Sequence, residues 1–155
     1  MRPNKNEYFL NIAESVSLRS LDPHTKCGCI FVKDDHIFST GYNSFAKNLN
    51  DNKLPKTRPE KYPWMIHSEI NAILNTKIKD AGYTAYITGE PCFNCLYNLY
   101  QHGCGEIIYS DYSKPQMVNE QDKDLKDLFF DSFYGMNKPI INKTKENYDR
   151  IIFRE

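Results

Sequence analysis

Two short motifs in this chain combine residue types that bind metals and move protons. His67 lies two residues before Glu69, while Cys92 and Cys95 follow Pro91 and are separated by two residues. A catalytic zinc site has three protein ligands and leaves the fourth coordination position to water. One imidazole and two thiolates meet this requirement, so we predict that His67, Cys92 and Cys95 bind one zinc ion.

Glu69 is not needed as a ligand in such a set. Zinc lowers the pKa of water bound to it toward neutrality, which makes a nucleophile available at pH 7. A carboxylate beside the metal can take up the proton and deliver it elsewhere. We therefore predict that Glu69 is the catalytic acid–base group.

Other interpretations of the cysteine pair carry less weight. Two cysteines separated by two residues also occur in structural zinc sites and in redox motifs. A structural site needs a fourth Cys or His at close spacing, and the sequence has no second such pair. A redox motif has no use for the upstream His67 and Glu69. The remaining Cys27, Cys29 and Cys104 lie in apolar contexts, which predicts core packing; a second metal site formed by them and a nearby histidine is the minor alternative.

Alternating apolar patterns predict an α/β layered domain. Helical spacing of apolar residues predicts helices over 8–16, 70–74, 93–102 and 125–133, and short apolar runs predict strands over 27–32, 37–42, 83–88, 106–109, 140–141 and 151–153. His67 and Glu69 then open one helix, and Cys92 and Cys95 open another. Two helix N-termini would face the metal, and their partial positive charge favours thiolates.

Composition narrows the classes of partner. The chain has 155 residues, which suits one domain over 1–155, and a formal net charge of zero. Zero net charge argues against a nucleic-acid partner. The polar N-terminus and the absence of a long apolar run argue against a membrane partner. Five cysteines, an odd number, suggest a reducing, cytoplasmic setting.

Between about residues 19 and 112 the sequence resembles the deoxycytidylate (dCMP) deaminases of the cytidine deaminase superfamily. The matching segments read RSLDPHTKCG at 19–28, STGYN at 39–43, KYPW at 61–64 and HSEINAI at 67–73. The histidine and cysteine motifs alone are typical of the whole superfamily. The resemblance implies a three-layer α/β/α fold with a central mixed sheet of about five strands. It also implies zinc-dependent hydrolysis of dCMP to dUMP and ammonia.

The resemblance implies roles for further residues. Asn43 would bond the sugar or nearby base atoms, the backbone N–H of Ser68 would contact the pyrimidine O2, and the backbone carbonyl of Glu90 would accept from the leaving amine. Arg19 is the best candidate for the 5′-phosphate, because its guanidinium offers forked donors, and Tyr112 is a weaker one. Arg19 could instead be an ordinary surface cation at the end of a helix.

The resemblance also implies a homo-oligomer, a hexamer or a dimer. In regulated members, a glycine and a Gly/Pro-rich loop after the G-Y-N segment help to bind dCTP and dTTP. Here Ser44 and residues 45–49 depart from that pattern, so we expect weak or altered regulation, and Mg²⁺ only if a nucleoside triphosphate effector binds. The alternative substrates are a 5-substituted dCMP, dCTP, a free (deoxy)cytidine or a guanine-like base. A non-catalytic, zinc-containing nucleotide-binding module is a further alternative.

Overall fold

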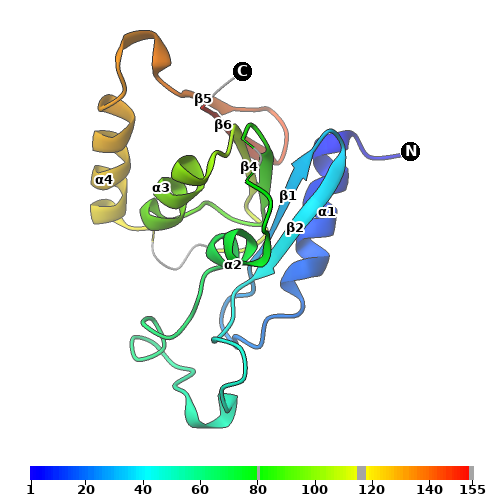
Figure 1. Cartoon of the computed structure of the whole chain (residues 1–155), viewed down its shortest axis with the longest axis vertical. Helices are drawn as coiled ribbons and strands as arrows, with labels where there is room; N and C mark the ends of the chain where they lie inside the picture. Colours follow the sequence, from blue (N-terminus) through cyan, green and yellow to red (C-terminus); the bar gives the residue numbers. More distant parts are fainter. Residues whose placement is uncertain (80, 115–117, 154–155) are drawn as a thin grey trace.

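The computed structural model describes residues 1–79, 81–114 and 118–153, which form a six-stranded sheet between two layers of helices (Figure 1). The helices are α1 (Lys5–Ser17), α2 (Ser68–Asn75), α3 (Phe93–His102) and α4 (Glu120–Asp131), with short 3₁₀ turns at Asp51–Lys53 and Gly135–Asn137. The strands are β1 (Gly28–Lys33), β2 (His36–Tyr42), β3 (Thr84–Ile87), β4 (Glu106–Ser110), β5 (Ile140–Lys143) and β6 (Tyr148–Ile152). Their order in the sheet is β2-β1-β3-β4-β6-β5.

The sheet is mixed, as the resemblance implied, but it has one strand more than the expected number of about five. Strands β3 and β4 are parallel and the other neighbours are antiparallel. The apolar pair predicted as a strand at 140–141 is part of β5, an edge strand that pairs with β6 from Ile140 opposite Ile152 to Lys143 opposite Asp149. All four of its residues are exposed, so β5 has no buried face and leaves only a brief apolar pair in the sequence.

Two apolar clusters attach the helices to opposite faces of the sheet. On one face, Phe9, Leu10 and Ala13 of α1 pack with residues of β1, β3 and β4. On the other face, Ala72 of α2 and Leu96 of α3 belong to the larger core cluster. This arrangement gives the three layers, with α1 alone on its side in Figure 1.

The connections bring the starts of α2 and α3 together. Strand β3 leads through residues 88–92 into α3, which returns the chain to the parallel strand β4. In such units, ligand sites form beyond the carboxyl ends of the strands. Helix α2 packs closely on β2 because Gly41 has no side chain: a Cβ there would lie 2.3 Å from the Ser68 carbonyl oxygen. No helix in the part of the chain described is long and apolar enough to cross a bilayer.

Candidate metal centre and active site

The three predicted ligands lie together where α2 and α3 begin. His67 is the N-cap of α2, Cys92 is the N-cap of α3, and Cys95 lies in the first turn of α3. Their ligand atoms all lie within 4.8 Å of one another. The Nδ1 atom of His67 is 3.5 Å from Cys92 Sγ and 3.3 Å from Cys95 Sγ. The helix starts therefore gather one nitrogen and two sulfur atoms at a single point.

The electrostatics of this trio favour a thiolate. The Cys95 thiol and His67 both hydrogen-bond Cys92, and they lower the pKa of Cys92 to about 4 although burial opposes ionisation. The same contact raises the pKa of Cys95 well above its ordinary value, as do burial and the nearby Glu69. The bond to Cys92 also raises the pKa of His67. A metal cation bound to both sulfur atoms would displace the proton that this hydrogen-bonded pair shares.

This donor set fits zinc. Two thiolates and an imidazole are ligands that zinc prefers. Within the part of the chain described, the cluster contains three His, Cys, Asp or Glu residues and no fourth. Three protein ligands without a fourth correspond to a catalytic site rather than to a closed structural one.

Glu69 lies beside the trio and outside it. It is the second residue of α2, it is buried, and the hydroxyl of Ser68 donates a hydrogen bond of 2.6 Å to Glu69 Oε1. Its charge is close enough to raise the pKa of Cys95 and, after burial, that of Cys27 to about 12. The carboxylate is thus held by its neighbour beside the metal-binding trio.

His67, Ser68, Glu69 and Cys92 line a small cavity of about 60 Å³. Its walls include Cys27 at the entry to β1, Asn43 after β2, Glu90 before Cys92, and Tyr62 of the long loop. Both side-chain atoms of Asn43 are already used: Nδ2 donates to the Thr25 carbonyl and Oδ1 accepts from the Cys27 N–H, each at 2.8 Å. Asn43 therefore fixes the strand entry and at the same time faces the cavity.

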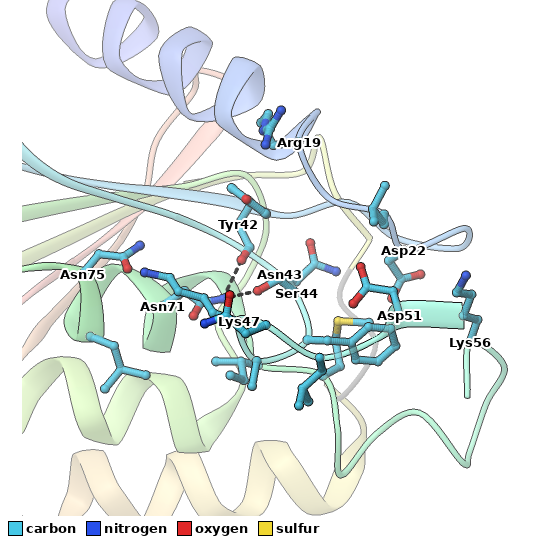
Figure 2. Close-up of a pocket in the computed structure, with 18 of the residues that line it drawn as sticks. Arg19, Asp22, Tyr42, Asn43, Ser44, Lys47, Asp51, Lys56, Asn71 and Asn75 are labelled. Atoms are coloured by element: carbon cyan, nitrogen blue, oxygen red, sulfur yellow. Dashed lines mark hydrogen bonds between the residues drawn. The ribbon is translucent and has the colours of Figure 1, made fainter. Parts of the chain in front are cut away.

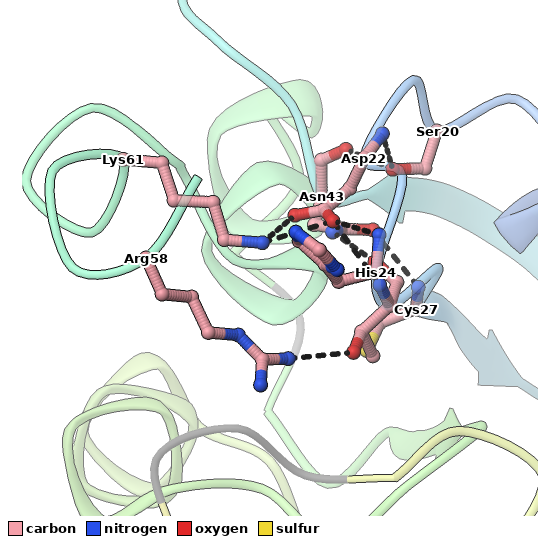
Figure 3. A network of polar contacts seen from close by, with 8 residues as sticks. Ser20, Asp22, His24, Cys27, Asn43, Arg58 and Lys61 are labelled. Carbon is pink, nitrogen blue, oxygen red and sulfur yellow. Dashed lines mark hydrogen bonds and ion pairs between the residues drawn. The ribbon is translucent and has the colours of Figure 1, made fainter. Parts of the chain in front are cut away.

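A fully buried ion pair joins the two loops around this cavity (Figure 3). Lys61 Nζ lies 2.9 and 2.8 Å from the two carboxylate oxygens of Asp22. Asp22 Oδ1 also accepts from the N–H groups of His24 and Thr25. Burial opposes the charge of Asp22, but these donors keep its pKa below the ordinary value. The R-S-L-D-P and K-Y-P-W segments are thus tied together, a role that the sequence did not indicate for either residue.

Two predicted substrate residues lie elsewhere. Arg19 is exposed and lines a second, larger pocket of about 840 Å³, whose lining also includes Asn43 (Figure 2). Tyr112 is half exposed in the turn after β4, where its N–H donates to Ser110 Oγ. The structure brings Asn43, Ser68 and Glu90 to the small cavity but does not place Arg19 or Tyr112 in its lining.

Helix α4 contributes two polar residues that the sequence analysis missed. Asp122 and Lys126 are both buried between α4 and the start of α3. Lys126 Nζ lies 3.4 Å from Glu90 Oε1. The only sequence signal was the spacing of Asn119 and Asp122, which is typical of a helix cap and gives no tertiary contact.

Comparison with known proteins agrees with this geometry. The model of the cytidine and deoxycytidylate deaminase zinc-binding region matches residues 3–111. The chain is 42% identical over 113 residues to a probable deoxycytidylate deaminase of Caenorhabditis elegans, an alignment that covers 68% of this chain and 56% of that protein. It is 34% identical over 111 residues to human deoxycytidylate deaminase, covering 66% and 62% of the two chains. The chain thus spans about six tenths of the length of these relatives.

A solved structure supports the fold. The dCMP deaminase of the cyanophage S-TIM5 superposes with a TM-score of 0.61 at 24% identity, covering 81% of this chain and 94% of that one. Fold and site together define an α/β domain of a zinc-binding class, in which one histidine and two cysteines form a cluster that could hold the metal. The chain belongs to the cytidine and deoxycytidylate deaminase family.

Proposed function

We propose that this chain is a zinc-dependent hydrolase that converts dCMP to dUMP and ammonia. The observation that carries the proposal is the position of Glu69, which is buried and lines the same cavity as His67 and Cys92 but lies outside the cluster of His67, Cys92 and Cys95. A structural zinc site has no use for an unliganded acid there. The names of the C. elegans and human relatives, both deoxycytidylate deaminases, support the choice of substrate.

Different residues of the chain would bind the metal and transfer protons. A zinc ion bound by His67, Cys92 and Cys95 would supply a Lewis acid that makes water nucleophilic at neutral pH. Glu69 takes a proton from the attacking water, delivers it to the ring nitrogen N3 and afterwards carries a proton to the amine, so that the C4–N bond breaks and a C4 carbonyl forms. The Ser68 hydroxyl holds the Glu69 carboxylate in place during these transfers.

Other groups would bind and orient the base. The Ser68 N–H is in the first turn of α2, where a helix N–H lacks an intrahelical acceptor and can donate to the pyrimidine O2. The backbone carbonyl of Glu90 would accept a hydrogen bond from the leaving amine. Asn43 Nδ2 and Oδ1 each make one hydrogen bond within the protein, and each can make a second one to the sugar or the base. Arg19 remains our candidate for the 5′-phosphate, with Tyr112 as the weaker one. The support for Arg19 is the large pocket that it shares with Asn43, since that pocket adjoins the cavity.

A substrate panel tests the proposal. Zinc-loaded protein is given dCMP, 5-methyl-dCMP, dCTP, deoxycytidine and guanine, and ammonia release is measured. We expect the highest kcat/KM with dCMP. A higher kcat/KM with another member of the panel would show that dCMP is not the preferred substrate. If no compound released ammonia, the non-catalytic nucleotide-binding alternative would be favoured.

We also propose a cytoplasmic homo-oligomer, a hexamer or a dimer. All five cysteines of the chain lie in the described residues and all are free thiols, which suits a reducing compartment. Exposed apolar side chains on the α3–α4 side, which include Tyr97, Leu128 and Tyr134, offer an area that association could bury. Sedimentation at working concentration tests the assembly, and a monomer would contradict it.

A further inference from the structure

Helix α4 contacts the metal-bearing segment at two points that flank Cys92. Asp122 Oδ1 accepts a hydrogen bond of 2.7 Å from the Phe93 N–H, directly after Cys92. Lys126 Nζ lies 2.7 Å from Asp122 Oδ2 and 3.4 Å from Oε1 of Glu90, two residues before Cys92. The side chains of Asp122 and Lys126 are only 8% and 10% exposed, so their ion pair is buried, whereas the Glu90 side chain is 39% exposed and its contact with Lys126 lies at the edge of this buried pair.

The start of α3 needs such a partner. A helix normally receives a side-chain acceptor from its own N-cap residue. Cys92 occupies that position and makes no capping hydrogen bond, and its sulfur is one of the three ligand atoms. The Asp122 carboxylate supplies the missing acceptor from another helix, and its negative charge is favourable at a helix N-terminus.

Lys126 makes this buried acid compatible with two nearby thiolates. An uncompensated carboxylate at this place would repel the Cys92 thiolate and would be costly to bury. Lys126 neutralises it and extends the link to Glu90, which lines the cavity. Val118, just before α4, also lines the cavity, so this end of α4 lies at the site itself.

We propose that Asp122, with Lys126 as its counterion, is a positioning residue that fixes Cys92 for metal binding. Both residues lie beyond residues 3–111, the part matched by the family model. The inference rests on the zinc site of the proposed function. Partners that orient metal ligands in this way typically change metal affinity by about 10–100-fold when they are removed.

The test is the rate at which zinc passes from the intact protein to a chromogenic chelator. We expect Asp122→Ala to release zinc about 10–100-fold faster than the wild type and Lys126→Met to do so by a smaller factor. The thiolate absorption of the cobalt(II)-loaded protein should shift in Asp122→Ala. Asp127→Asn is the matched control, because Asp127 forms an exposed ion pair with Lys123 on the same helix. Its release rate should equal that of the wild type.

Asp122→Asn distinguishes positioning from a purely structural role. It keeps an oxygen acceptor for the Phe93 N–H but loses the charge, and a neutral hydrogen bond is about half as strong. Its release rate should therefore lie between those of the wild type and Asp122→Ala. If Asp122→Ala does not fold, the release rate of Asp122→Asn alone tests the positioning role. Wild-type behaviour of Asp122→Asn in both readouts, or equally fast release from Asp127→Asn, would overturn the inference. If the wild type takes up no zinc, the proposed function itself fails.

Discussion

The small cavity and the large pocket share Asn43 but are built in different ways. The cavity of about 60 Å³ is lined by Ser68 and Glu69 at the start of α2, by the N-caps His67 and Cys92, and by loop residues such as the buried Asn43. The pocket of about 840 Å³ is formed mainly by residues 42–56 and by Arg19, and Figure 2 shows its charged side chains spread over loops. The metal-binding and acidic groups of the cavity thus come from the starts of helices, whereas the charged side chains of the large pocket come from loops and a short 3₁₀ turn.

This difference suggests separate tasks for the two regions. Bond breaking needs groups that are fixed to within a fraction of an ångström, which helix N-termini provide. Binding the flexible part of a nucleotide tolerates exposed cations on loops. If the tasks are separate, changes in the cavity should abolish the reaction for every substrate, whereas changes in the large pocket should alter only the choice among substrates.

The largest effect should follow the loss of a metal ligand. Cys95→Ala removes one of the two sulfur atoms, and a site with two protein ligands cannot hold zinc firmly. We expect stoichiometric zinc in the wild type, little in the variant, and no measurable deamination of any substrate. Elemental analysis and circular dichroism check metal content and fold together. Full retention of zinc by Cys95→Ala would show that the ligand set is wrong.

Replacement of Glu69 tests the cavity without removing its metal. Glu69→Gln keeps the size and the acceptor for the Ser68 hydroxyl but cannot carry protons. We expect zinc content to stay normal and kcat for dCMP to fall by about 10²–10⁴-fold, the usual scale for a general acid–base group. Near-normal turnover by this variant would rule out the mechanism.

The ion pair between Asp22 and Lys61 couples the two regions, since Asp22 lines the large pocket and the loop of Lys61 supplies Tyr62 to the cavity. Lys61→Met leaves a buried carboxylate without its partner, so it should lower the free energy of unfolding by about 3–5 kcal/mol. Urea unfolding measures this loss. Lys5→Met is the control, because it breaks the exposed pair with Asp35 and should change stability little. An equal loss in both variants would contradict the assigned role.

The same pair predicts a pH dependence. The pKa of Asp22 is lowered in the folded protein, so its charge stabilises the fold at pH values above the unfolded pKa of about 3.9. That contribution should disappear as the pH falls through the lower, folded-state pKa. As the pH is lowered, the free energy of unfolding should therefore fall more steeply for the wild type than for Asp22→Asn. The same pH dependence in both proteins would show that the charge of Asp22 does not stabilise the fold.

The two regions also differ in how far the sequence predicted them. His67, Glu69, Cys92 and Cys95 could be found because their types and spacing are local, and the apolar periodicity beside them placed both helices. The contacts of Lys61 with Asp22 and of Asp122 with the Phe93 N–H join residues 39 and 29 positions apart. Such contacts depend on how loops and helices pack, and no local pattern encodes them. For the same reason, the exposed strand β5 was less visible than the buried β1.

Arg19 tests the large pocket directly. If the guanidinium binds the 5′-phosphate, its contact is worth about 1.5–3 kcal/mol, and Arg19→Ala should lower kcat/KM for dCMP by roughly 10–100-fold. Activity on deoxycytidine should stay the same, since that substrate never makes the contact. Lys56→Ala is a control from another part of the same pocket (Figure 2) and should change both activities little. If Arg19→Ala lowered kcat/KM equally for dCMP and deoxycytidine, Arg19 would have a structural role instead.

The smallest effect should be the response to a triphosphate at the large pocket. Ser44 is held on both sides there: its backbone pairs with Ile66 through hydrogen bonds of 3.0 and 2.7 Å, and its hydroxyl accepts from Asn71 Nδ2 at 2.9 Å. A side chain fixed in this way, in place of a glycine, limits how closely a triphosphate can approach the backbone.

With dCTP and Mg²⁺ present, kcat/KM for dCMP should therefore change by less than the roughly 5-fold at which typical allosteric coupling begins. Initial rates at low dCMP, with and without dCTP, measure the effect. Sigmoidal kinetics that dCTP converts to hyperbolic ones would show that the pocket is a regulatory site, and Ser44→Gly should then respond at least as strongly as the wild type.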